Sequence, residues 1–230
     1  MPNILQKTVA GHNRYYVEGD ALISRRKPLV GCSAIAHYAD ATDNDNLLRW
    51  AAGAALASGY RDEYKLISQY AMDIGSMLHQ EVDQYIADES IPSSPSDLFN
   101  IWRKALQRKK IEWWASEYRV YHRQLLYGGT ADAIGTWGKD VVVFDWKTGN
   151  KSSYTFKPSQ AVQVAGYCLA LEEMHILDPS IPVPTAGVVM YIYKNTGTAE
   201  WRSINLEQAK EVFQLCHGIY VRTQKGGLYE

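Results

Sequence analysis

The chain has 230 residues, of which 46% are hydrophobic, enough for one sizeable domain with a packed core. Its 24 basic and 25 acidic residues give a net charge of -1, so any basic surface for nucleic acid must be local. The widely spaced Cys32, Cys168 and Cys216 exclude a disulfide framework and a clustered metal site. The start lacks a leader pattern and no apolar run approaches the ~18 residues of a membrane span, so we expect a cytoplasmic protein with no membrane partner.

The first half of the chain is predicted to be mainly helical. Residues 14–24 alternate enough for a short hairpin, and 43–59 begin with cap-type residues and end at a glycine, as helices do. Residues 62–89 carry apolar side chains at helical spacing. Within them, Gly75 and Ser76 are expected to divide the helix in two, with the serine capping the second part.

Residues 98–115, "LFNIWRKALQRKKIEWWA", are predicted to form a basic, aromatic helix. Cations interleaved with tryptophans suit tracking of a nucleic-acid backbone together with stacking on unpaired bases. A solvated helix face with some core tryptophans explains the same composition equally well. The candidates for nucleic-acid binding are Arg103, Lys104, Arg108, Lys109, Lys110, Trp113 and Trp114.

From residue 116 onward the pattern changes to the two-residue period of strands. Segments 116–124, 126–138 and 140–149 are predicted strands, and the tight turn "GTWGKD" between the last two favours an antiparallel meander. A helix from about residue 158 to 175, two strands around an Asn-Thr-Gly turn and a last helix follow. We therefore expect a mixed α/β core at 116–230 and a mainly helical region at 1–115, forming one compact unit.

The predicted strand "VVVF" runs directly into two charges, Asp145 and Lys147. Side chains two apart share a strand face, and pairing through the turn would bring Asp132 beside Asp145. Two close carboxylates repel unless they share a proton or a cation, and their oxygens suit Mg²⁺ or Mn²⁺. The peptide carbonyl of Trp146 could add a third ligand, and the lysine would face a phosphate, as phosphodiester hydrolysis requires. The alternative is an ordinary surface ion pair, worth ~0–1 kcal/mol.

The segment "GTAD", with "DWK" thirteen residues further on, resembles the PD-(D/E)XK nuclease superfamily. Gln163 and Tyr167, at i and i+4 on one helix face, resemble the Gln-xxx-Tyr motif of its RecB-type branch. "GSMLHQEVDQYI" resembles the Gly-xxx-His helix of that branch, which implies that His79 joins the metal ligands. Within the branch, the chain looks most similar to phage-type exonucleases and the mitochondrial genome maintenance exonuclease.

The resemblance implies a restriction-endonuclease-like mixed sheet flanked by helices, with the helical region over the active site. It implies that Gln163 holds a water or Lys147, and that Tyr167 contacts a phosphate. Glu117 would be the acidic residue of the first strand, able to bind a second metal or a water. Each assignment has a structural alternative. His79 would be a packed or solvated histidine, and Glu117 would belong to the polar face of a strand. Gln163 and Tyr167 would be ordinary helix residues.

The function that follows is a metal-dependent exonuclease acting on DNA ends, with a preference for single strands. A structure- or sequence-specific endonuclease and a non-catalytic binding protein are the alternatives. The scattered cysteines exclude the iron–sulfur cluster of some members of the branch, and the sequence has no Walker motif for a nucleotide. The resemblance implies DNA as the substrate, and the compact, motor-free form suggests a role in phage recombination or replication, with a recombination or replication protein as a partner.

Overall fold

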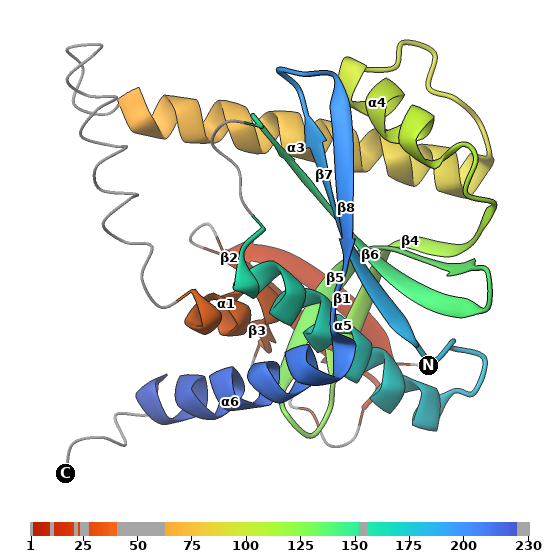
Figure 1. Cartoon of the computed structure of the whole chain (residues 1–230). Helices are drawn as coiled ribbons and strands as arrows, with labels where there is room; N and C mark the ends of the chain where they lie inside the picture. Colours follow the sequence, from red (N-terminus) through yellow and green to blue (C-terminus); the bar gives the residue numbers. More distant parts are fainter. Residues whose placement is uncertain are drawn as a thin grey trace.

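A computed structural model describes residues 2–9, 12–20, 23, 28–40, 63–151 and 156–224. These residues form a mixed α/β fold in which helices cover both faces of a mixed β-sheet, as predicted (Figure 1). The helix expected at 43–59 lies outside the described residues. Within the described ranges, no helix is both long and apolar enough to cross a membrane.

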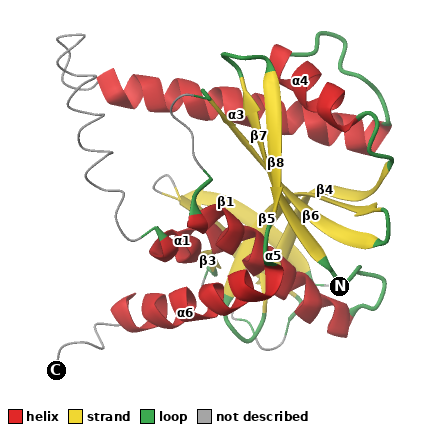
Figure 2. Ribbon diagram, viewed as in Figure 1, coloured by secondary structure: helices red, strands yellow, loops and turns green. Residues whose placement is uncertain are grey.

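The secondary structure elements alternate as expected for a mixed α/β chain, and Figure 2 colours them by type. The strands are β1 (Asn3–Val9), β2 (His12–Glu18), β3 (Val30–Gly31), β4 (Ile111–His122), β5 (Tyr127–Trp137), β6 (Asp140–Gly149), β7 (Ala186–Tyr193) and β8 (Thr198–Ser203). The helices are α1 (Cys32–Ala36), the 3₁₀ helix η1 (His37–Ala39), α3 (Glu63–Asp88), α4 (Asp97–Leu106), α5 (Pro158–Leu177) and α6 (Leu206–Gln224).

The main sheet has six strands in the order β3-β5-β6-β7-β8, with β4 paired to β5. The predicted antiparallel meander β4-β5-β6 is confirmed. Helix α5 then crosses over so that β7 pairs parallel to β6, and β8 returns antiparallel to β7 after the turn at Gly197, which has φ +65°. Because β6 and β7 are parallel, their carboxyl-terminal ends lie at the same edge of the sheet.

The middle strand β5 has a break in pairing on one of its two sides. Strand β4 runs along one side of β5 from end to end. On the other side, β6 pairs with residues 133–137 and β3 pairs with residues 127–128. The last β5–β6 pair joins Ala133 to Phe144. The two strands therefore diverge at the next residue of each, Asp132 and Asp145.

Two hydrophobic cores lie on the two faces of the sheet. Helices α3 and α4 cover one face. There Leu78, Val82 and Trp102 pack with Phe144 and Trp146 of β6 and form the first core. Helices α1, α5 and α6 and the β1–β2 hairpin cover the other face and form the second core with it. In Figure 1, α3 crosses one side of the sheet while α5 and α6 lie on the opposite side. Since consecutive residues of β6 serve opposite faces, Trp146 belongs to the first core while its neighbours face away from it.

Helix α3 is continuous, so the expected break at Gly75 and Ser76 is wrong. A single glycine costs a helix about 1 kcal/mol, and the buried side chains of Leu78 and Val82 outweigh this cost by packing in the first core. Ser76 is therefore an interior helix residue and not a cap.

The helix predicted at 98–115 is also wrong in its second half. Helix α4 ends at Leu106, Lys110 has φ +48°, and β4 begins at Ile111. Between Ile111 and Trp114 the burial pattern alternates between partly buried and exposed, which is the strand period. Packing of the partly buried tryptophan Trp113 against the first core therefore overrides the local helical composition.

The hairpin at the start of the chain uses a different partner from the one predicted. Residues 12–18 form β2, which pairs antiparallel with β1 upstream instead of with the residues that follow. Residues 21, 22 and 24 of the predicted hairpin lie outside the described residues. Strand β2 also meets the region before β3 through a bridge between Tyr15 and Leu29.

Candidate active site

A polar cleft with a volume of about 1180 Å³ lies beside the point where β5 and β6 diverge. Most of its walls come from the β1–β2 hairpin, helix α3 and the end of β6, which are distant in sequence, and single residues of β4 and of the segment after β7 complete them. The lining residues that carry the argument are His79, Glu117 and Lys147, with Asp83 and Lys194 further along the wall.

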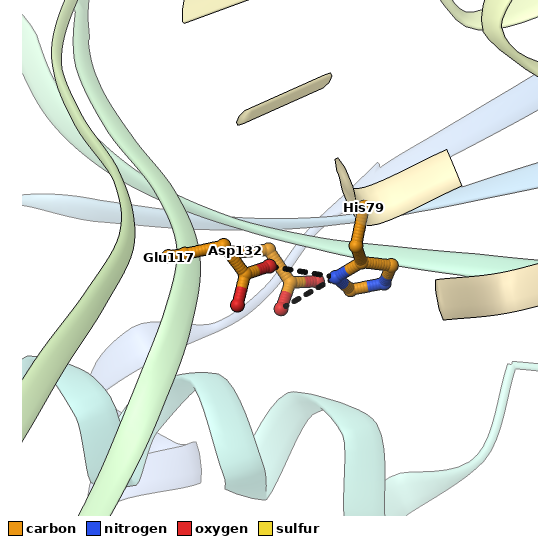
Figure 3. Close-up of side chains that lie close together, drawn as sticks. All are labelled: His79, Glu117 and Asp132. Carbon is orange, nitrogen blue, oxygen red and sulfur yellow. Dashed lines mark hydrogen bonds and ion pairs between the residues drawn. The ribbon is translucent and has the colours of Figure 1, made fainter. Parts of the chain in front are cut away.

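His79, Glu117 and Asp132 meet at this cleft from α3, β4 and β5 (Figure 3). The Nδ1 atom of His79 is 2.9 Å from Oε1 of Glu117 and 3.6 Å from Oδ1 of Asp132. One donor atom from each residue lies within 4.8 Å of the other two. The arrangement brings one imidazole and two carboxylates close enough to share a metal ion.

Glu117 has an unusual backbone for a residue inside a strand. Its φ is +44°, whereas the other described non-glycine residues with positive φ, Glu89, Lys110 and Leu126, lie outside the strands and helices. A left-handed conformation costs a side-chain-bearing residue roughly 1–2 kcal/mol, and such strain gathers at functional sites. The strain turns the Glu117 carboxylate toward His79.

A second group of side chains surrounds Asp145, which is fully buried. Nζ of Lys147 is 2.6 Å from Oδ2 of Asp145. Gln163 donates from Nε2 to Oδ1 of Asp145 at 3.3 Å and to the hydroxyl of Tyr167 at 2.5 Å. Asp145 and Lys147 thus lie on one strand face, and Gln163 and Tyr167 lie on one helix face, as the strand and helix periods predict. The amide of Gln163 links the two pairs and fixes the orientation of the carboxylate.

Asp132 connects the two groups of side chains. Its Oδ2 accepts a 2.6 Å hydrogen bond from the backbone N–H of Trp146, while Oδ1 faces His79. The carboxylate thus takes the place of a strand partner where β5 and β6 diverge. Together with burial, the charge of Asp132 helps to raise the pKa of Asp145.

The surroundings of the site raise the pKa of Asp145, Asp132 and His79. Burial raises the pKa of Asp145 to about 6, with the Asp132 charge adding to this and Lys147 opposing it. Burial likewise raises the pKa of Asp132, although His79 and Lys147 lower it. Burial by itself would lower the pKa of His79, but Asp132 and Glu117 outweigh it and raise that pKa to about 9. Without a metal, protonated His79 and Lys147 are therefore the cations that offset the charge of these carboxylates.

Helix α5 approaches the sheet closely behind this site because small residues line the contact. A Cβ on Gly129 of β5 would lie 2.5 Å from Cε1 of Tyr167. On the helix, a Cβ on Gly166 would lie 2.4 Å from Sγ of Cys32, and that thiol donates to the backbone carbonyl of Gln163. These close contacts place Gln163 and Tyr167 against Asp145.

The predicted nucleic-acid-binding residues lie apart from the cleft lining. Arg103 and Lys110 border a small hollow with Trp113, and Lys109 lies over the rings of Trp137 and Trp201 at 5.4 and 4.5 Å. The set as a whole surrounds the end of α4 and the start of β4, and it comprises Arg103, Lys104, Arg108, Lys109, Lys110, Trp113 and Trp114. Trp114 is 41% exposed, whereas Trp113 packs against the rings of the first core.

Sequence reasoning missed two further residues of the cleft wall. Asp83 follows His79 by four residues, so the i, i+4 rule for one helix face could have found it. Lys194 follows β7 directly, and its backbone N–H donates to the carbonyl of Gly149 at the end of β6. Only the parallel β6–β7 pairing brings this lysine to the cleft, and no local signal announces that pairing.

The fold and the site define a class of enzyme: metal-dependent nucleases with an acidic residue and an Asp-x-Lys segment on adjacent strands of a mixed sheet. The chain belongs to the PD-(D/E)XK nuclease superfamily, whose family model matches residues 45–224. Members of this superfamily act on nucleic acids and use divalent metals.

Other comparisons add little to the family assignment. No curated protein matches the chain. Among solved structures, the crystal structure of SSO0001 is similar at 13% sequence identity, with a TM-score of 0.40, covering 86% of this chain and 79% of that chain.

Proposed function

We propose that the protein is a metal-dependent exonuclease of the RecB-type branch that hydrolyses phosphodiester bonds from DNA ends and prefers single strands. The observation that carries the proposal is the meeting of His79, Glu117 and Asp132 in a cleft that Lys147 also lines. The residues come from three different elements, which is the expected arrangement for a site and not for a local surface cluster.

The donor set fits a divalent cation. Two carboxylates and one imidazole offer the oxygen and nitrogen ligands that Mn²⁺ and Mg²⁺ accept, and the nitrogen favours Mn²⁺. The raised pKa of buried Asp132 fits a place where a cation is meant to balance the charge. We propose Asp145 and the Trp146 carbonyl as additional ligands. The proposal includes no iron–sulfur cluster and no nucleotide.

When bound, the metal would supply a Lewis acid that makes water a better nucleophile and offsets charge on the phosphate. Lys147 reaches from Asp145 toward the cleft, where its ammonium would orient the water or stabilise charge on phosphorus. Gln163 would hold Asp145 in place and Tyr167 would contact a phosphate. In-line attack of water on phosphorus would break the bond to the 3′ oxygen, which takes up a proton, leaving a 5′-phosphate and a 3′-hydroxyl.

The proposed substrate is a strand end. Helix α3 and the β1–β2 hairpin both line the cleft, and we propose that a single strand enters along them. The cations and tryptophans around residues 103–114 are proposed to contact DNA outside the cleft. A phage recombination or replication protein is the kind of partner that would supply such ends to a cytoplasmic enzyme.

The test uses 5′-end-labelled linear single-stranded DNA and a closed circular single strand, each with Mg²⁺, Mn²⁺ or EDTA. We expect cleavage of the linear strand alone, abolished by EDTA and by Asp132→Asn. Cleavage of the circle would replace the exonuclease proposal with an endonuclease. Metal-independent DNA binding without cleavage of either strand would identify a non-catalytic member of the superfamily.

A further inference from the structure

Helix α3 meets strand β4 through two neighbouring polar contacts. His79 and Asp83 are four residues apart and so lie on the same face of α3. Their partners, Glu117 and Ser116, are consecutive residues of β4. His79 contacts the Glu117 carboxylate at 2.9 Å, and the hydroxyl of Ser116 donates to Oδ1 of Asp83.

Consecutive side chains of a regular strand point to opposite faces, so they do not normally reach the same helix. Ser116 and Glu117 both reach α3 because the positive φ of Glu117 interrupts the alternation. The strained backbone therefore needs an anchor beside it, since a relaxed strand would turn the Glu117 carboxylate away from His79.

We propose that Asp83 and Ser116 are positioning residues of the metal site. Their hydrogen bond fixes β4 on α3 next to the strained residue, and so keeps Glu117 and His79 at ligand distance. The inference rests on the proposed metal-dependent function and deepens it by assigning two residues that act through the ligands.

Asp83 lines the same cleft, yet its role differs from that of a ligand. Among the described residues, the donor group within 4.8 Å contains His79, Glu117 and Asp132, and Asp83 is outside it. The Asp83 carboxylate is instead engaged by the Ser116 hydroxyl. Groups that orient metal ligands without touching the metal commonly change metal affinity about 10-fold or more when removed.

The test measures Mn²⁺ binding to the full chain by calorimetry without DNA, together with thermal unfolding in EDTA. We expect Ser116→Ala to raise the Mn²⁺ dissociation constant about 10-fold. Asp83→Asn should weaken binding in the same direction. Ser116→Thr keeps the hydroxyl and should restore most of the affinity.

Helix α3 offers a matched control at Glu81, which accepts from the hydroxyl and the backbone N–H of Ser96. This contact links α3 to the start of α4, whereas the Asp83–Ser116 contact links α3 to β4. The side chain of Ser96 also caps α4 by accepting from the N–H of Phe99. Ser96→Ala should therefore lower the unfolding temperature while leaving Mn²⁺ affinity at the wild-type value.

Two results would overturn the inference alone: wild-type Mn²⁺ affinity in Ser116→Ala, or an equal loss of affinity in Ser96→Ala. A wild-type chain that binds no Mn²⁺ would overturn the proposed function and the inference with it. A loss confined to the Asp83 and Ser116 variants supports both.

Discussion

Lys147 connects a fully buried carboxylate with the cleft. Its side chain is 23% exposed and its Nζ lies 2.6 Å from Oδ2 of Asp145, which has no exposed surface. Removal of the lysine would leave Asp145 without its counter-charge and the cleft without a cation beside the ligands. Both effects act on the charged transition state more than on substrate binding.

We therefore expect Lys147→Ala to lower kcat/KM for labelled single-stranded DNA by about 10²- to 10³-fold. Lys151→Ala is the control, because Lys151 pairs with the exposed Glu200 and does not line the cleft. Both variants should keep wild-type circular dichroism. Retained cleavage in Lys147→Ala would contradict its role.

His79 predicts the pH dependence of stability in metal-free protein. Its pKa is about 9 in the folded state against 6.5 for a free histidine, so the folded state holds the proton more tightly. The stabilisation is complete below about pH 6.5 and is lost as pH rises through about 9. The free energy of unfolding in EDTA, measured with urea, should fall across this window, and His79→Gln should lack that fall. A rising free energy in the wild type would refute the assignment.

The placement of several candidate residues was predictable from the sequence. Asp145 and Lys147 end an apolar run, and the turn before β6 puts Asp132 next to them, so local pattern and strand period suffice. The closeness of Glu117 to His79 could not be derived in this way, because it depends on a positive φ inside a strand. Such strain is imposed by packing of α3 against β4 and leaves no mark on composition.

At the scale of elements, helices α3 and α5 permit a test in which a glycine of each helix is replaced by alanine. A Cβ on Gly75 would meet only Oγ1 of Thr148, at an ordinary 3.7 Å. Gly75→Ala should therefore raise the free energy of unfolding by about 0.5–1 kcal/mol, as alanine does in a helix interior.

Gly166→Ala, in the middle of α5, should do the opposite. Its Cβ would lie 2.4 Å from Sγ of Cys32 and 2.5 Å from Cε2 of Phe213, inside a packed core. Overpacking of this kind typically costs about 1–3 kcal/mol. Urea unfolding of the two variants measures both effects, and destabilisation by Gly75→Ala would show that α3 is interrupted at this residue.

The elements themselves were predictable where one period dominates. The meander, α5 and α6 follow clear patterns, whereas residues 107–115 carry helix-forming cations beside strand-forming Ile and Trp residues. There the contacts of Trp113 with Trp102 and Phe144 decide the structure, and those contacts join separate parts of the chain. Pairing of β1 with β2, and of β6 with β7, is likewise a choice among partners that no single segment specifies.

At the scale of the whole molecule, a net charge of -1 requires any contacts with nucleic acid to be local. Arg108 and Lys110, both exposed beside β4, are candidates for phosphate contacts. Replacing both by alanine should reduce the slope of log K against log salt by about 2 while kcat stays unchanged. Fluorescence anisotropy at several salt concentrations measures the slope. An unchanged slope would remove this surface from the DNA path.

The short strand β3 has a consequence for how the chain can be divided. The family model begins at residue 45, yet β3 and α1 precede it, with Cys32 and Ile35 fully packed in the second core. A chain trimmed to that starting point would leave the N–H and C=O groups of Tyr127 and Gly128 on β5 as an open sheet edge. Open edges recruit strands from other molecules, so the trimmed protein should self-associate on size-exclusion chromatography. We therefore expect the segment before residue 45 to protect the protein from aggregation.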